Sequence, residues 1–382
     1  MNSKTALVDW VNSLSFGLKK MNSHLPLIGI SGPTASGKSD LAVEIAIGLD
    51  AEIINADSVQ LYNGLDIGSG KITAEEMKGV EHHLLSTFEP NQEIDAWSFA
   101  SLAREKIEEI AKMGKPSILA GGSGLYLQSV IHGLIDETAV SEEVRATFEA
   151  KSKSLIEEHG EQGFAAELHR WLEEIDPVSA AEIQTADRAR TGRAILCFLE
   201  TGSSIRELQL KHGNQHVYNF EEKPFLVIAL LPEREQLYQK INSRVVSMWE
   251  SGLVEEVKAI QEKYPNCKQL NAVGYRHAAQ FISGEISKSQ AVEEMQKDTR
   301  RLAKRQLTWW RNQPLKLGWN YLDFGPSEGL EPSSICDISA LIGERFGSET
   351  AAENFLNGFL EEGSDKDLSG QVFFLPFTNV KL

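Results

Sequence analysis

Apolar residues follow two alternating patterns over the first part of the chain. Short apolar runs predict buried strands at 27–30, 53–54 and 116–120. Apolar residues at three- and four-residue intervals predict helices over 41–49 and 98–112. Strands that alternate with helices form a parallel sheet with right-handed crossovers, so the pattern indicates an α/β fold.

The pattern changes near residue 138. No strand is predicted between 138 and 218, where charged helical stretches are broken near Gly160, Pro177 and Gly202. A strand pattern returns at 225–231 and is followed by another amphipathic helix. The α/β core is therefore expected to be discontinuous, with an all-helical insertion.

The chain is expected to have five segments and shows no internal repeat. They are a leader without fixed structure at 1–24, the first part of the core at 25–137, the insertion at 138–218, the second part of the core at 219–322, and an acidic tail at 323–382.

The acidic tail is expected to be dispensable for catalysis. Residues 317–382 carry 11 acidic and 3 basic side chains and lack long periodic elements. Only short apolar runs occur, such as Phe355-Leu356 and Phe373-Phe374-Leu375. The alternative is that these runs dock on the core and stabilise it.

Cysteine usage and hydropathy indicate a cytoplasmic protein with no membrane partner, and we expect a monomer. Cys197, Cys267 and Cys336 are odd in number and follow no disulfide or zinc-site spacing. Residues 1–24 lack the continuous apolar stretch of a secretory signal, and Met21 is an alternative start. The sequence contains no run of about 18 apolar residues, which is the length needed to span a bilayer.

A glycine-rich segment between the first predicted strand and helix fits the phosphate-binding pattern G-x-x-x-x-G-K-[ST]. It consists of Gly32, Pro33, Thr34, Ala35, Ser36, Gly37, Lys38 and Ser39. Its backbone N–H groups and Lys38 suit a diphosphate, and the Ser39 hydroxyl suits Mg²⁺ as a cofactor. The segment indicates a P-loop NTPase-like core, and by itself it predicts an NTPase or a kinase.

The net charge of −17 argues against a nucleic-acid partner unless the basic residues are clustered. Two clusters exist. Residues 297–316 carry 7 basic and 1 acidic side chains, and residues 188–212 carry 5 basic and 2 acidic ones. Both segments suit contact with an RNA backbone.

Several further motifs occur in a fixed order. They are Asp57-Ser58-Val59-Gln60-Leu61-Tyr62, Leu65-Asp66-Ile67-Gly68-Ser69-Gly70-Lys71, Gly79-Val80-Glu81-His82-His83-Leu84, Gly121-Gly122-Ser123-Gly124-Leu125-Tyr126-Leu127, Ala272-Val273-Gly274-Tyr275-Arg276 and the run from Thr299 to Arg311. Together they resemble the tRNA dimethylallyltransferase (isopentenyl-tRNA transferase) family over residues 27–322.

The resemblance implies transfer of a dimethylallyl group from dimethylallyl diphosphate, with Mg²⁺, to the exocyclic amine of the adenosine 3′ of the tRNA anticodon. Asp57 is a carboxylate at the end of a predicted strand, beside the phosphate loop. From its position alone it is a helix N-cap, a Mg²⁺ ligand or a catalytic group. The resemblance makes it the general base.

Ser123 and Arg244 take catalytic roles only through the resemblance. Ser123 lies on a glycine-rich turn, where a serine is often just a turn residue. The family usually has threonine there, near the leaving diphosphate and the acceptor adenine. Arg244 would otherwise be an exposed helical arginine, but in the family it binds the diphosphate.

The resemblance also implies contacts with the tRNA anticodon stem-loop. The residues are Asp57, Ser58, Val59, Gln60, Arg145, Ala189, Arg190, Thr191, Gly192, Arg193, Arg300 and Arg301. The sequence departs from the family pattern at Ile72, Glu81, Ala186 and Leu196. These departures concern the details of RNA contact more than the chemistry.

Two residue pairs have competing interpretations. His82 and His83 lack a third ligand at suitable spacing, so polar packing is favoured over a metal site. Trp309 and Trp310 are either core aromatics or, with their basic neighbours, a surface for RNA phosphates and bases. The charge of the segment favours the second interpretation.

Three other functions are alternatives to this prediction. A prenyltransferase acting on free AMP, ADP or ATP would share the chemistry but has little need of the insertion. A P-loop nucleotide or nucleoside kinase needs only the phosphate loop. An RNA-binding module without turnover is disfavoured by intact Lys38, Ser39, Asp57 and Arg244.

Overall fold

The computed structural model describes residues 27–133, 140–205, 207–208, 225–265, 267–316, 320–323 and 371–375. The described part divides into two compact units, of which the second is His132–Val217 and the first comprises the residues on either side. The expected leader and most of the expected tail lie outside the described residues. Within the described part, no helix is long and apolar enough to cross a membrane.

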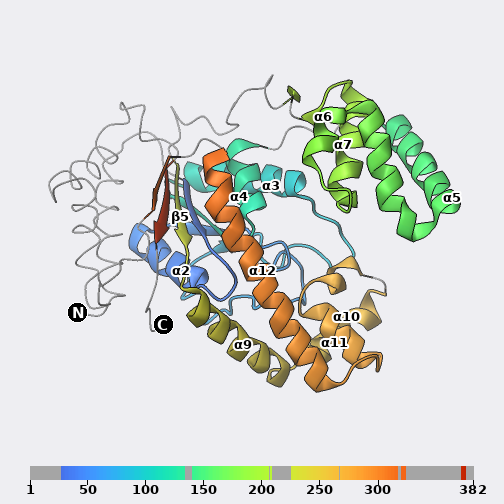
Figure 1. Ribbon diagram of the computed structural model, residues 1–382. Coiled ribbons are helices and arrows are strands. Elements are labelled where there is room, and N and C mark those ends of the chain that lie inside the picture. Colours follow the sequence, from blue (N-terminus) through green and yellow to red (C-terminus); the bar gives the residue numbers. More distant parts are fainter. Residues whose placement is uncertain are drawn as a thin grey trace, which may run out of the picture. The chain divides into compact units, whose positions relative to one another are not determined.

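The first unit contains a seven-stranded sheet in which every neighbouring pair is parallel (Figure 1). The strands are β1 (Leu27–Ser31), β2 (Glu52–Asn55), β3 (His82–His83), β4 (Ser117–Gly121), β5 (Phe225–Leu230), β6 (Asn320–Asp323) and β7 (Gln371–Leu375). Their spatial order is β3-β2-β4-β1-β5-β7-β6. The predicted parallel α/β core is confirmed.

Strand β1 lies between β4 and β5. Leu27 is in register with Ser117 of β4 and with Phe225 of β5. Because the strands are parallel, the segments that follow β1, β2 and β4 all start at the carboxyl ends of the strands, on the same side of the sheet. The phosphate loop, Asp57 and the glycines after β4 therefore lie near one another.

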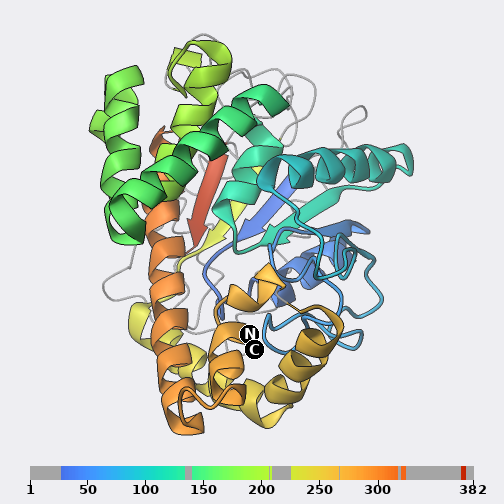
Figure 2. The same ribbon diagram turned by 90° about the vertical axis from the view of Figure 1, so that its right-hand side faces the viewer.

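Helices of the first unit connect and cover these strands (Figure 2). They are α2 (Lys38–Leu49), α3 (Ala96–Lys112), α4 (Gly124–His132), α9 (Arg234–Glu250), α10 (Leu253–Lys263), the 3₁₀ helix η1 (Lys268–Asn271), α11 (Tyr275–Ile282) and α12 (Lys288–Lys316). The apolar residues that predicted α2 and α3 are buried. Helix α3 begins two residues before the expected position because the Asp95 side chain accepts a hydrogen bond from Ser98 N–H at 2.7 Å.

Part of the tail belongs to the sheet. Strand β7 lies between β5 and β6 and pairs with both in parallel. The alternative interpretation, in which apolar runs of the tail dock on the core, therefore holds for Gln371–Leu375, whereas dispensability for catalysis stays a prediction. The physical reason is that backbone pairing with β5 requires no long periodic pattern. The run Phe355-Leu356 lies outside the described residues.

The second unit is helical and has a core of its own. Its helices are α5 (Glu142–Ile175), α6 (Pro177–Glu182) and α7 (Arg188–Thr201). The expected breaks occur as a non-helical Gly160 with φ 68°, Pro177 in the first turn of α6, and Gly202 as the cap of α7. The core includes Leu168, Trp171, Leu172, Ala180, Ala194 and Ile195.

Candidate active site

The phosphate loop lies between β1 and α2, as the motif predicted. Gly37 precedes the helix with a φ of 86°, a conformation that glycine adopts without strain. Gly32 lies so close to β5 that an added Cβ would be 2.8 Å from the carbonyl oxygen of Leu230. Ser36 Oγ is buried and has no hydrogen-bond partner within the described residues. The loop thus presents backbone N–H groups and an unpaired hydroxyl at the N-terminus of a helix, which favours an anion.

Lys38 is half-buried at the end of this loop. Its Nζ donates to the Pro33 carbonyl at 3.5 Å. Burial lowers the pKa of Lys38 to about 8, the nearby Asp57 carboxylate opposes that shift, and Arg244 adds to it. The three charged groups therefore lie close enough to influence one another. A bound anion would restore the preference of Lys38 for its charged form.

Asp57 follows β2 and caps the turn that comes next. Its Oδ1 accepts hydrogen bonds from Val59 N–H at 2.9 Å and Gln60 N–H at 3.4 Å. Asn55 holds the backbone of Asp57, with 3.3 Å between Asp57 N and Asn55 Oδ1. Within the described residues, no hydrogen bond goes to Oδ2. The capping interpretation of Asp57 is therefore correct for one oxygen and leaves the other for chemistry.

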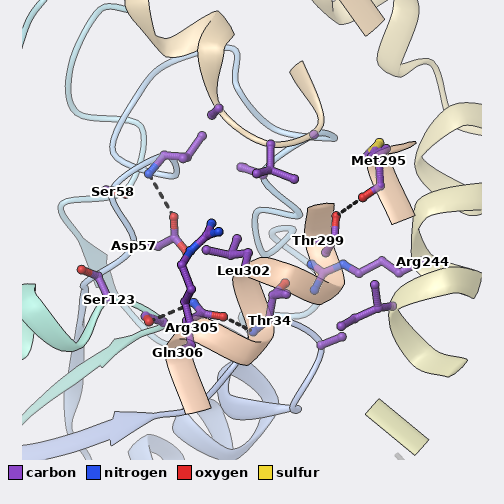
Figure 3. A pocket seen from close by; sticks show the side chains of 18 of the residues that line it. Thr34, Asp57, Ser58, Ser123, Arg244, Met295, Thr299, Leu302, Arg305 and Gln306 are labelled. Atoms are coloured by element: carbon purple, nitrogen blue, oxygen red, sulfur yellow. Dashed lines mark hydrogen bonds between the residues drawn. The ribbon is translucent and has the colours of Figure 1, made fainter. Parts of the chain in front are cut away.

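Ser123 lies on the turn between β4 and α4, close to Asp57 in the pocket of Figure 3. Its Oγ accepts a long hydrogen bond of 3.4 Å from Tyr126 N–H. The turn is tightly packed, since a Cβ at Gly121 would overlap the Ala56 carbonyl and one at Gly124 would overlap the Trp309 ring. Glycine at these positions lets the turn approach both β2 and α12.

Arg244 projects from α9 into the same pocket (Figure 3). Its Nη2 donates to the Gly70 carbonyl at 2.9 Å, and burial lowers the pKa of the guanidinium. The interpretation of Arg244 as an exposed helical arginine is therefore wrong. Helix α9 directs it inward from the face that also buries Ile241 and Val245.

A cavity of about 350 Å³ joins these groups. Its polar side includes Thr34, Asp57, Ser123, Arg244 and Gln306 (Figure 3). Its apolar side is formed by side chains from α9, α12 and the segment before α11. They are Ile241, Val245, Met248, Val273, Met295, Leu302 and Trp309. The arrangement suits a ligand with a charged head and a small apolar group.

Ser58 and Val59 also line this cavity, whereas Gln60 is turned toward the 66–70 segment. Gln60 Nε2 donates to the carbonyls of Ser69 and Gly70, each at 3.2 Å. Ser58 and Val59, which were expected to contact tRNA, therefore lie at the cavity wall, whereas the Gln60 side chain makes hydrogen bonds within the protein.

Helix α12 contributes residues that the motif search did not single out. Gln306 accepts from Thr34 N–H at 3.0 Å and donates to the Gly122 carbonyl at 2.9 Å, so it links the phosphate loop to the Ser123 turn. Arg305 also lines the cavity. The signal was present in the sequence, because Thr299, Leu302, Gln306 and Trp309 recur at helical intervals and form one face.

The expected RNA-facing residues of α12 differ from one another. Trp310 is completely buried in the core, so its assignment to an RNA surface is wrong, and Trp309 lines the cavity. Arg300 donates to Asn242 Oδ1 at 2.6 Å. Arg301 is exposed and pairs with Asp298 at 2.9 Å.

The second unit brings Arg145 of α5 next to the predicted residues of α7. Arg145, Ala189, Gly192 and Arg193 line one cavity of about 380 Å³. Arg190 is exposed and pairs with Asp187 at 3.5 Å. Thr191 is completely buried and donates to the Asp187 carbonyl, so its side chain faces the core and not a partner.

His82 and His83 pack through hydrogen bonds to protein atoms. His82 Nδ1 lies 2.9 Å from the Val80 carbonyl oxygen, and His83 Nε2 lies 2.8 Å from Glu52 Oε2. The expected polar packing is therefore present. Among the described residues, no group of three or more His, Cys, Asp and Glu side chains has an arrangement that could hold a metal.

Comparison with known proteins agrees with the motifs. A family profile described as IPP transferase matches residues 60–313. A tRNA dimethylallyltransferase of Bacillus subtilis is 37% identical over 311 residues, which cover 81% of this chain and 94% of the relative.

Solved structures give the same answer. The full-length tRNA isopentenylpyrophosphate transferase of Bacillus halodurans is 34% identical with a TM-score of 0.52, over 75% of this chain and 87% of the other. A eukaryotic dimethylallyltransferase acting on tRNA shares the fold, with a TM-score of 0.67 at 23% identity over 88% and 85% of the two chains. The chain belongs to the IPP transferase family.

Proposed function

We propose that the protein transfers a dimethylallyl group from dimethylallyl diphosphate to the exocyclic amine of the adenosine 3′ of the anticodon in tRNA, releasing diphosphate. The relatives named above support this assignment. The observation that carries it is the cavity, which is lined by phosphate-loop residues, by Asp57, Ser123 and Arg244, and by apolar side chains of α9 and α12.

The chemistry follows from these groups. The adenine amine attacks the allylic carbon of the prenyl donor, the carbon–oxygen bond breaks, and its electron pair leaves with the diphosphate. Asp57 accepts the proton that the amine loses. The apolar wall excludes water from the allylic carbon, which bears cationic character as the bond breaks.

Stabilisation of the leaving diphosphate is the largest electrostatic task of the site. Lys38 and Arg244 supply positive charge, and the loop from Gly32 to Ser39 supplies N–H donors. The buried Ser36 hydroxyl gains an acceptor when a diphosphate binds. Ser123 supplies a further hydroxyl from the turn after β4, which lies beside the phosphate loop.

The site also suits Mg²⁺. The Ser39 hydroxyl lines a small cavity next to the phosphate loop and is a hard oxygen ligand of the kind that Mg²⁺ prefers. When bound there with the diphosphate, the ion neutralises charge on the leaving group.

Separate features of the structure support tRNA as the acceptor substrate. The exposed Arg190 and Arg193 of α7, with Arg145, offer positive charge to an RNA backbone. Ser58 and Val59 line the cavity that must receive a base swung out of its stack. We place the protein in the cytoplasm, as a monomer, because its substrates are there and its cysteines follow no disulfide pattern.

The apolar wall favours a prenyl donor over the phosphoryl donor of a kinase. The test is to incubate the purified protein with Mg²⁺, unmodified tRNA and dimethylallyl diphosphate, and to analyse the tRNA nucleosides by mass spectrometry. A product heavier by one dimethylallyl group at the adenosine 3′ of the anticodon is expected. Prenylation of free AMP in place of tRNA, or consumption of ATP without a prenyl donor, would overturn the proposal.

A further inference from the structure

The segment from Asp66 to Gly70 is held by a carboxylate from a distant helix. Glu256 of α10 accepts hydrogen bonds from three successive backbone N–H groups, those of Asp66 at 3.1 Å, Ile67 at 2.7 Å and Gly68 at 3.1 Å. Both carboxylate oxygens take part. Charge-assisted bonds of this kind fix a backbone more firmly than neutral ones do.

Tyr275 fastens the same segment from α11. Its hydroxyl donates to Glu256 Oε1 at 2.8 Å and accepts from Ser69 N–H at 3.0 Å. The side chain is completely buried, and burial raises the pKa of its hydroxyl above the ordinary value. The hydroxyl therefore stays protonated and keeps both bonds.

The far end of the segment meets Arg244. The Gly70 carbonyl accepts from Arg244 Nη2 at 2.9 Å. A Cβ at Gly70 would overlap the Arg244 guanidinium, and a Cβ at Gly68 would be 2.6 Å from the Tyr275 ring. The segment thus fits between Tyr275 and Arg244 only because two of its residues are glycines.

We infer that Glu256 and Tyr275 are positioning residues that set the place of the Arg244 guanidinium in the cavity. They hold the 66–70 segment, and the segment holds Arg244 through the Gly70 carbonyl. The inference rests on the proposed function, in which Arg244 binds the diphosphate. Neither Glu256 nor Tyr275 lines the cavity.

A shift of the Gly70 carbonyl would move or release a charge that must meet the leaving group. Small displacements of such a charge lower the rate strongly because its stabilisation depends on preorganisation. Substitution of Glu256 or Tyr275 should therefore weaken diphosphate binding and leave tRNA binding unchanged. A merely structural role would lower thermal stability without this selectivity.

The first experiment compares Tyr275→Phe with Tyr264→Phe. Tyr264 is a matched control. Its hydroxyl also donates a hydrogen bond to a carboxylate, that of Glu89, which is not part of the 66–70 segment and does not line the cavity. For Tyr275→Phe, the KM of dimethylallyl diphosphate and the inhibition constant of inorganic pyrophosphate should each rise about tenfold, with the KM of tRNA unchanged. Tyr264→Phe should change none of them, and equal effects in both variants would overturn the inference.

The second experiment is a double-mutant cycle with Arg244→Ala. If Tyr275 acts through Arg244, adding Tyr275→Phe to Arg244→Ala should change pyrophosphate inhibition by less than about twofold. A full tenfold effect in that background would overturn the positioning role while leaving the proposed function intact. If Arg244→Ala alone left pyrophosphate inhibition normal, the proposed role of Arg244 would fail and the positioning role with it.

Glu256→Gln provides an independent variant should Tyr275→Phe not fold. The amide keeps the volume of the side chain but replaces one acceptor oxygen with a donor, so at least one loop N–H loses its partner. The same selective weakening of pyrophosphate inhibition is expected, again absent with Arg244→Ala. A fall in melting temperature with normal pyrophosphate inhibition would contradict the inference.

Discussion

One carboxylate oxygen of Asp57 caps the turn and the other is proposed to accept the proton, and a substitution can separate the two roles. Asparagine keeps an Oδ1 acceptor for Val59 N–H but cannot take a proton. Asp57→Asn should therefore lower kcat by about 10² to 10⁴ while both KM values and the melting temperature stay near wild type. Single-turnover rates at saturating substrates measure the effect on chemistry.

Asp57→Ala is the control for the structural part. It removes the cap of the turn as well as the base, so it should also lose about 1 kcal/mol of stability. Near-normal turnover in either variant would show that Asp57 is not the base.

The half-buried Lys38 should make the reaction sensitive to alkaline pH. Its pKa of about 8 in the free protein means that the cation is lost as the pH rises through 8. A diphosphate prefers the charged form, so kcat/KM for dimethylallyl diphosphate should be constant with respect to this group below pH 8 and fall above it. Lys38→Arg keeps a cation at all these pH values and should abolish the fall, whatever its absolute rate. An alkaline limb that persists in Lys38→Arg would assign it to another group.

The sequence predicted those residues that act through a local motif. The phosphate loop, Asp57, Ser123 and Arg244 each belong to a short run. Thr34, Asp57, Ser123 and Arg244 line the larger cavity, and Lys38 and Ser39 line a smaller cavity that Asp57 also lines. Glu256 and Gln306 were not predicted. The backbone partners of Glu256 lie 188 or more residues away and those of Gln306 lie 184 or more away, so only the tertiary fold shows what they bind.

At the scale of elements, apolar runs predicted β1, β2, β4 and β5, and the helical period predicted α2, α3 and α9. Strands β1 and β2 are buried along their whole length, whereas the helices bury residues at helical intervals. The breaks in the insertion were predicted for a local reason, namely glycine and proline chemistry. Periodicity did not predict β6 and β7, which are joined to the sheet by backbone pairing. The charge count of α12 led to the wrong prediction that Trp310 faces RNA. A count of basic residues does not show that Trp310, between the arginines, points into the core.

Helix α7 should bind tRNA through exposed charge. The double variant Arg190→Ala with Arg193→Ala should weaken tRNA binding and reduce the slope of log K against log salt by about 0.7 to 0.9 for each phosphate that is no longer neutralised. The KM of dimethylallyl diphosphate should not change. Filter binding at several salt concentrations provides the measurement.

A matched control removes the same charge elsewhere in the second unit. Lys153 and Arg170 are both exposed on α5, where they pair with Glu157 and Glu167. Replacing both with alanine should leave the salt slope unchanged. An unchanged slope in the α7 variant would place the RNA site on another surface.

At the scale of the whole molecule, the sheet depends on residues that lie after all the matched motifs. A chain ending at Ser327 lacks β7 and leaves β5 without that neighbour. Its melting temperature should fall by about 5 °C or more, because removal of the strand exposes an edge of the core sheet. Calorimetry compares it with a chain ending at Pro376, which keeps β7 and should melt like the full chain. Equal melting of the two would restore the view that the tail is dispensable.

The position of β1 between β4 and β5 has a consequence for the nascent chain on the ribosome. One neighbour of β1 ends at Gly121, but the other is not complete until Leu230, after the whole helical unit has been made. At typical bacterial and eukaryotic elongation rates the central strand has an unpaired edge for roughly 5 to 20 seconds. An unpaired apolar strand is a template for aggregation. We therefore expect soluble yield to depend more on translation speed and on chaperones that shield nascent chains between residues 121 and 230 than on the stability of the finished enzyme.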